Sequence, residues 1–176
     1  MKTSKTNEFS ASSASTISFK ALSSDDLIEL LPSFYLDLDF DARRARFGCA
    51  VSDDSIGRYC RGLDLDHAVV LGCVGPAGLI VVIELHPLSS TWEDAELALA
   101  EKPTADRIMI VGHLLQLAAF TAGKRGCNTL VVPLGPSERD LLLLLRGMGR
   151  VRVHEDSARV DLGEYARLHG LSIGQP

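Results

Sequence analysis

The sequence predicts an α/β (α+β) protein built on a single mixed, mostly antiparallel sheet flanked by helices. This prediction rests on the order of the elements, because strands cluster in hairpins before and after a central strand-helix-strand unit. The length of 176 residues suits one domain, and 46% apolar with 23% charged residues is typical of a globular protein. We therefore expect one folded core.

The two ends of the chain are expected to lie outside that core. Residues 1–16 are mostly Ser, Thr, Lys and Asn, with too little apolar surface to offset the entropy of ordering. We predict a disordered polar tail there, a domain over 17–169, and a loose C-terminal end over 170–176.

One strand and three short helices are predicted in the first part of the domain. The strand is expected at 17–21 and the helices at 25–31, 41–47 and 55–61. Ser23 and Ser24 are typical helix caps, and Pro32 is expected to stop the first helix. Ser52 is expected to cap the third helix and Gly62 to end it.

Strands dominate from residue 67 onward. Apolar runs, alternating patterns and turn residues predict strands at 68–71, 79–83, 95–100, 129–132, 150–154 and 158–162. The glycine-containing segment 72–78 is expected to join the first two as a hairpin. Helices are expected at 112–125, where apolar residues recur at helical spacing, and at 137–146.

Charge and cysteine patterns narrow the class of function. The net charge of −5 is the wrong sign for wrapping nucleic acid or docking on anionic lipid. The longest apolar runs span five residues, too short for a membrane helix, and no secretory signal is visible. Four widely spaced cysteines fit a reducing cytoplasm, and the five histidines lack zinc-ligand spacing. We expect a cytoplasmic protein without metal.

Several segments resemble the GNAT (Gcn5-related N-acetyltransferase) superfamily. DAELALA at 94–100 looks like the family's fourth strand, and AGKRG at 122–126 is similar to the end of its third helix. Arg46 and Phe47 are similar to a pair in one subset of the family, and LRGMG at 145–149 lies where the family often carries a Gly-aromatic step. The resemblance covers roughly 17–162 and implies an acyl-CoA-dependent N-acetyltransferase acting on an amine.

The resemblance implies acetyl-CoA as acyl donor, with its pyrophosphate at a helix N-terminus. The family loop reads Gln or Arg, two residues, Gly, one residue, then Gly or Ala. Arg107 and Gly112 match its ends, whereas Ile110 replaces the middle glycine and disfavours a positive φ angle there. The cofactor-binding residues implied are Leu99, Arg107, Val111, Gly112, His113 and Leu114. The alternative is a surface arginine followed by a helix-start glycine.

The resemblance also implies that Glu96 is the catalytic base that takes the proton of the acceptor amine. The alternative is a charged residue on the solvent face of an alternating strand. Residues 138–146 lack the helix-four tyrosine that many members use as acid, and Tyr165 lies much further along. Together with Ile110, this motivates a second hypothesis: a non-catalytic GNAT-fold ligand-binding or assembly protein with weak or no coenzyme A binding.

Two helical features each have two interpretations. Arginines gather at 43, 44, 46, 58 and 61, either as solvated helix surfaces or as the edge of an acceptor site for an acidic substrate. The run 141–145 is leucine throughout, so its helix is expected to be buried under the sheet or in a homodimer, which we expect.

Overall fold

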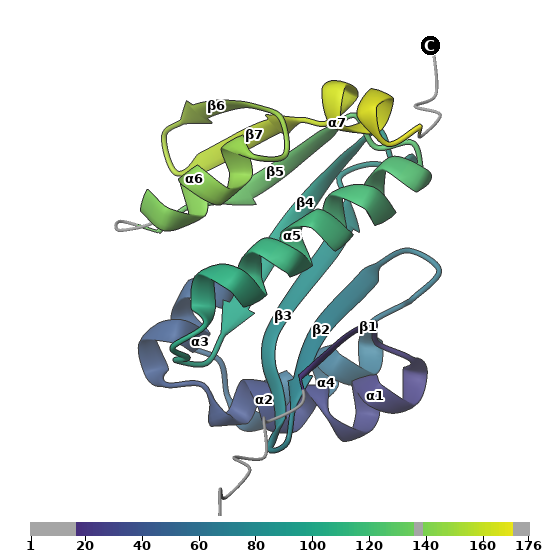
Figure 1. The fold of residues 1–176 in the computed structure, drawn as a ribbon. Helices are drawn as coiled ribbons and strands as arrows, with labels where there is room; N and C mark the ends of the chain where they lie inside the picture. The colour runs from purple at the N-terminus through teal and green to yellow at the C-terminus, as the bar shows by residue number, and fades with distance from the viewer. Residues whose placement is uncertain (1–16, 136–138, 171–176) are drawn as a thin grey trace, which may run out of the picture.

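A computed structural model describes residues 17–135 and 139–170, so the predicted tail, the final residues and the cap expected at Ser137 lie outside the described residues. Within them, strands form one sheet in the order β1-β2-β3-β4-β5-β7-β6 (Figure 1). Neighbouring strands are antiparallel except β4 and β5. The predicted fold class is confirmed.

The strands are β1 (Ser18–Ala21), β2 (Val69–Gly75), β3 (Gly78–Pro87), β4 (Asp94–Glu101), β5 (Thr129–Pro133), β6 (Arg150–His154) and β7 (Ser157–Asp161). The helices are α1 (Ser24–Glu29), α2 (Leu31–Asp37), α3 (Phe40–Phe47), α4 (Asp53–Gly62), α5 (Arg107–Lys124), α6 (Arg139–Arg146) and α7 (Gly163–Leu168). None of the helices in the described parts of the chain is long and apolar enough to cross a bilayer.

The prediction that Pro32 stops the first helix is wrong. Ser23 caps α1 through a capping box with Asp26, as the sequence indicates, but the chain bends at Leu30 and continues as α2. Pro32 lies in the first turn of α2, where a residue without an N–H donor loses no helical hydrogen bond. The proline therefore begins a helix that the sequence analysis did not predict.

Three further boundaries differ from the prediction. The hairpin of β2 and β3 is confirmed, but its strands extend to Gly75 and Gly78, so the turn is much shorter than 72–78. Helix α5 begins at Arg107 and not near Gly112, because Ile108 to Val111 continue the helix. The chain after β7 forms α7, which was not predicted.

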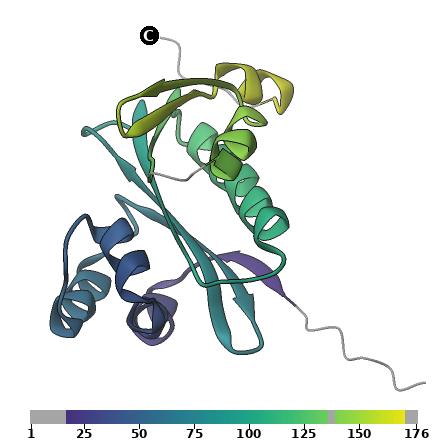
Figure 2. The same ribbon diagram turned by 90° about the vertical axis from the view of Figure 1, so that its left-hand side faces the viewer.

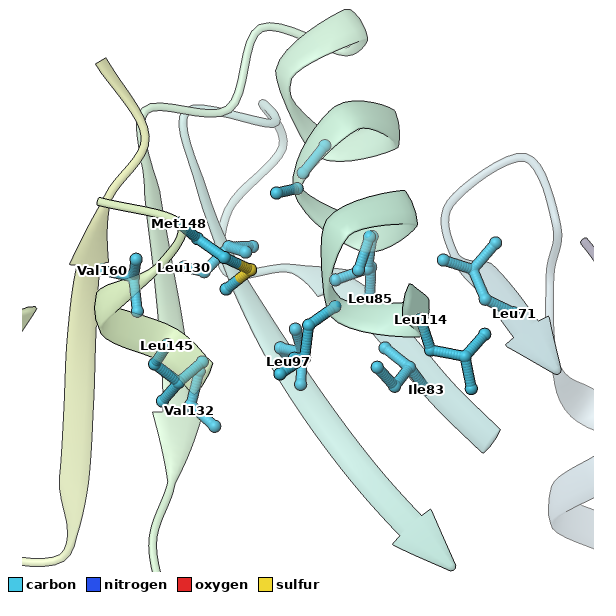
Figure 3. Close-up of a cluster of buried hydrophobic side chains, with 14 of the residues drawn as sticks. Leu71, Ile83, Leu85, Leu97, Leu114, Leu130, Val132, Leu145, Met148 and Val160 are labelled. Carbon is cyan, nitrogen blue, oxygen red and sulfur yellow. The ribbon is translucent and has the colours of Figure 1, made fainter. Parts of the chain in front are cut away.

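Helices cover both faces of the sheet (Figure 2). Helices α5 and α6 pack on one face over the larger core, whose buried side chains include Ile83, Leu97, Leu114 and Leu145 (Figure 3). Helices α1, α2 and α4 pack on the other face around Phe34 and Ile56. In the run 141–145, Leu141 and Leu145 are buried whereas Leu143 is exposed, so one side of α6 faces solvent and the homodimer stays a prediction.

The centre of the sheet opens on one side. Strand β4 pairs with β3 along its whole length, but with β5 only from Asp94 to Glu96. Strand β5 then continues beside β7, while β4 runs on to Glu101 without β5 as a neighbour. From Leu97 onward, this edge of β4 has no strand partner among the described residues.

Candidate functional site

A cavity of about 380 Å³ lies where β4 and β5 diverge. One wall is β4 from Glu96 to Glu101, a second wall is the chain at the end of β5, and α3 closes the cavity with Arg46 and two alanines. Most lining side chains are small or apolar: Ala42, Ala45, Ala98, Leu99, Ala100, Pro133, Leu134, Gly135 and Leu141. The volume is within the roughly 300–1,000 Å³ typical of small-molecule sites.

Glu96 and Leu99 both line this cavity from β4. Glu96 is half-buried at the last position where β4 still pairs with β5, opposite Val131. Its carboxylate has no hydrogen-bond or ion-pair partner among the described residues. Glu96 thus lines a cavity, and its role as a base stays a prediction.

Arg107 does not line the cavity and is the first residue of α5. Its guanidinium binds Glu101 Oε1 through Nε at 2.8 Å and Nη2 at 2.7 Å, and Glu101 itself lines the cavity. The first intrahelical bond of α5 is donated by Ile110 to Asp106 O, at 3.0 Å. The amides of Ile108 and Met109, which precede this bond, therefore lack helical acceptors and are the ones that an anion at this helix start would meet.

The other implied cofactor residues lie inside α5 and not in a loop. Val111 and Leu114 are fully buried in the core under the sheet. Gly112 packs near Leu144 of α6, and the backbone amides of these residues fall within the helical hydrogen-bond ladder. The ring of His113 stacks on Phe19 of β1 at 5.3 Å, toward the far edge of the sheet. The structure therefore brings Glu96 and Leu99 together in the cavity. The other four implied residues, which lie inside α5, do not line it.

A buried carboxylate that the sequence analysis missed lies behind the cavity. Glu84 of β3 is 0% exposed and accepts hydrogen bonds from the hydroxyls of Tyr35 and Tyr59. Arg46 Nη2 lies 2.7 Å from Glu84 Oε2, and His86 Nε2 lies 2.8 Å from the same oxygen. We call these five side chains the Glu84 cluster; they join α2, α3 and α4 to β3.

The contacts within the cluster favour the ionised forms of both Glu84 and Arg46. Burial alone raises the pKa of Glu84, but the hydrogen bond from His86, the charge of Arg46 and the two tyrosine hydroxyls lower it to about 2. Burial also lowers the pKa of Arg46, and the adjacent Glu84 carboxylate more than offsets this, so that it lies above its ordinary value. Burial and the Glu84 charge raise the pKa of both Tyr35 and Tyr59. Glu84 and Arg46 form a permanent ion pair at neutral pH.

The cluster corrects one interpretation of the sequence. Of the five arginines grouped as a basic surface, Arg46 is buried against Glu84, whereas Arg43 pairs with Asp53 and with backbone carbonyls. A signal for Glu84 is present in the sequence, since it is a single charged residue within the apolar run of β3. Its partners come from three helices, and no spacing in the sequence reveals them.

The helix-four tyrosine implied by the family has no counterpart on α6. Tyr165 lies on α7, and its hydroxyl donates to Gln116 O at 3.1 Å. It lines a separate pocket with Arg146 and His169 and does not line the cavity beside β4. The acid toward a leaving thiolate is therefore not supplied by either position.

Comparison with known proteins gives similarity in structure without similarity in sequence. No protein-family model matches the chain, and no curated protein matches it by sequence. The GNAT domain of S. lividans PAT superposes with a TM-score of 0.64 at 18% identity, covering 81% of this chain and 87% of that one.

Two further solved structures extend the similarity. Spermidine N-acetyltransferase from Vibrio cholerae, in complex with CoA and spermine, has a TM-score of 0.60 at 13% identity, covering 81% of this chain and 92% of its own. The protein yncA from Salmonella typhimurium, with its cofactor acetyl-CoA, has a TM-score of 0.61 at 13% identity, covering 85% and 96%. The chain therefore has the fold of the GNAT acetyltransferase superfamily.

Proposed function

We propose that this protein is an acyl-CoA-dependent N-acetyltransferase whose acceptor amine meets the acetyl group in the cavity beside β4. One observation carries the proposal: β4 and β5 separate immediately after Glu96, and the space between them holds an unpartnered carboxylate. The unpaired edge of β4 from Leu97 to Glu101 suits a ligand arm that contains amide groups, because such an arm can bond to it as a strand does.

The proposed reaction requires two contributions from the protein: a group that accepts a proton and walls that exclude water. In this reaction the neutral amine attacks the thioester carbonyl carbon, the C–S bond breaks, and the thiolate leaves with the electron pair. Glu96 takes the proton that the amine must lose, and the apolar walls around Leu99 and Leu134 exclude water that would hydrolyse the thioester. Removal of the base should therefore lower turnover more than affinity.

The start of α5 is where the donor's phosphates would be held. The backbone amides of Ile108 and Met109 lie before the first intrahelical acceptor and are donors to an anion, whereas Asp106 and Glu101 oppose it with negative charge. The fit is weaker than a glycine-rich loop would give. We therefore expect modest affinity for acetyl-CoA.

A second candidate is a non-catalytic protein of the same fold that binds a ligand in this cavity. It is favoured by the extension of α5 to Arg107, which puts helix where the family has its loop, and by the lack of a tyrosine on α6. This candidate predicts no acetyl transfer to any amine.

The test is thiol release from acetyl-CoA with a panel of primary amines, followed for the full chain and two variants. Glu96→Gln should lower kcat by roughly a hundredfold with little change in affinity for acetyl-CoA. Glu93→Gln is the matched control, since this exposed carboxylate lies three positions earlier and does not line the cavity. Equal activity of Glu96→Gln and the wild type would remove Glu96 from the mechanism, and no transfer by the wild type would favour the second candidate.

A further inference from the structure

Arg46 has more hydrogen-bond donors than the protein uses. A guanidinium has five N–H donors, and both polar contacts of Arg46 are made by Nη2, to the Tyr59 hydroxyl at 2.6 Å and to Glu84 Oε2 at 2.7 Å. Nε is buried without a partner. Nη1 has no protein partner among the described residues either, but unlike Nε it is accessible to solvent, although the side chain as a whole is only 9% exposed.

Glu84 does not supply those bonds. Its Oε2 accepts from Tyr59, His86 and Arg46 Nη2, and its Oε1 accepts from Tyr35, so neither Nε nor Nη1 of Arg46 is bound by this carboxylate. The rings of Tyr35, Phe47 and Tyr59 lie with their centroids 5.0 to 5.7 Å from Arg46 Cζ. These contacts fix the guanidinium in place and leave its remaining N–H groups without a protein acceptor.

Arg46 lines the cavity, and of its unused donors Nη1 is the one that a ligand can reach. Arg46 is the one cationic side chain among the described residues that line it. Of the two carboxylates in the lining, Glu101 is paired with Arg107 through Oε1, and its Oε2 is buried without a hydrogen-bond partner. Glu96 has no ion-pair partner among the described residues, so the lining combines one cation that has a spare donor, one paired carboxylate and one unpaired carboxylate.

This arrangement is complementary to a small zwitterion. We propose that the acceptor is a small amino acid with an apolar side chain, its carboxylate held by Arg46 and its amino group placed at Glu96. The inference rests on the proposed function for the transfer step, but the binding it describes does not require that step. Arg46 acts as a binding residue, because a guanidinium holds a carboxylate through charge-assisted hydrogen bonds.

The wild-type protein decides this without any mutation. L-alanine, L-valine and L-leucine are compared as acceptors with ethylamine, isobutylamine and isopentylamine, which are the same molecules with hydrogen in place of the carboxylate. With each substrate concentration expressed as its neutral-amine form, because the two classes of amine differ in basicity, we expect kcat/KM for each amino acid to exceed that of its amine by roughly tenfold or more, the ratio that one charge-assisted hydrogen bond supplies. Amines that react as well as the amino acids would overturn the proposal.

Calorimetric titration of the protein with L-valine and with isobutylamine, without acetyl-CoA, separates this inference from the proposed function. Heat with L-valine alone supports the site even if no transfer is found, whereas equal or absent binding of both contradicts it. In Arg46→Lys, checked for folding by circular dichroism, the preference for L-valine should fall because a lysine has no planar pair of donors. An unchanged preference in the folded variant would also overturn the role of Arg46.

Discussion

Replacing Glu84 by glutamine should destabilise the protein strongly, although the change adds no volume. The variant leaves Arg46 charged and 9% exposed with no counter-ion. The pKa of Glu84 is held at about 2 against an ordinary value of 4.5, a difference that corresponds to about 3 kcal/mol of stability at neutral pH. Breaking one half of a buried ion pair costs about 3–5 kcal/mol in other proteins. The two estimates agree, so we expect a loss of about 3 kcal/mol.

The loss should depend on pH with a defined sign. The folded-state pKa of Glu84 is depressed, so its contribution is fully present above pH 4.5 and is lost as pH falls toward 2. At pH 3 about 2 of the roughly 3 kcal/mol is already gone from the wild type. The gap between the wild type and Glu84→Gln should therefore narrow between pH 5 and pH 3.

Urea unfolding followed by circular dichroism at pH 7, 5 and 3 measures this gap. Glu96→Gln is the matched control: it is also a carboxylate on a neighbouring strand, but it has no partner, so its stability should lie within about 0.5 kcal/mol of the wild type. In an Arg46→Met background, Glu84→Gln should cost much less, because the unpaired charge is gone. If the free energy of unfolding of Glu84→Gln lay within about 0.5 kcal/mol of the wild-type value at pH 7, the reasoning would be refuted.

Two other predictions use matched residues. Leu114→Ala should lower the free energy of unfolding, measured in urea, by about 2–5 kcal/mol because Leu114 is fully buried. Leu143→Ala, on the exposed side of α6, should change it by less than about 0.5 kcal/mol. Equal effects of the two substitutions would contradict the assigned core. Maleimide labelling of the native protein should modify Cys49, which is exposed, and spare the buried thiols, since burial raises the pKa of Cys60 and Cys127 to about 11. Mass spectrometry of Cys49→Ser should then find almost no label, and rapid labelling of that variant would show the interior thiols to be accessible.

The fold was predictable from the sequence because its signals are local. Alternating and β-branched runs place the strands, and Ser23 and Ser52 cap α1 and α4 as expected. The prediction that Pro32 ends the first helix was wrong because a proline can either follow the end of one helix or lie in the first turn of the next. The bend at Leu30 decides between the two, and it is visible only in the structure.

The site was predictable only in part. Glu96 was predicted as a base because the resemblance matches a short strand pattern; the structure shows that it lines a cavity, and its role stays a prediction. The loop implied by the same resemblance is helix, because Ile110 and Val111 are buried in the core, and this packing offsets the lower helix propensity of β-branched residues. The Glu84 cluster could not be predicted from the sequence, because its side chains meet only through tertiary packing of α2, α3 and α4 on β3.

The central claim is that acetyl-CoA reaches the cavity beside β4. Calorimetric titration of the full chain with acetyl-CoA tests it most directly when repeated on Ala45→Trp, which fills the cavity from an exposed position on α3, and on Ala77→Trp, an exposed alanine in the turn between β2 and β3. The account predicts saturable binding by the wild type and Ala77→Trp, and binding weakened by roughly tenfold or more in Ala45→Trp. Absence of heat at millimolar acetyl-CoA, or undiminished binding by Ala45→Trp, would contradict it.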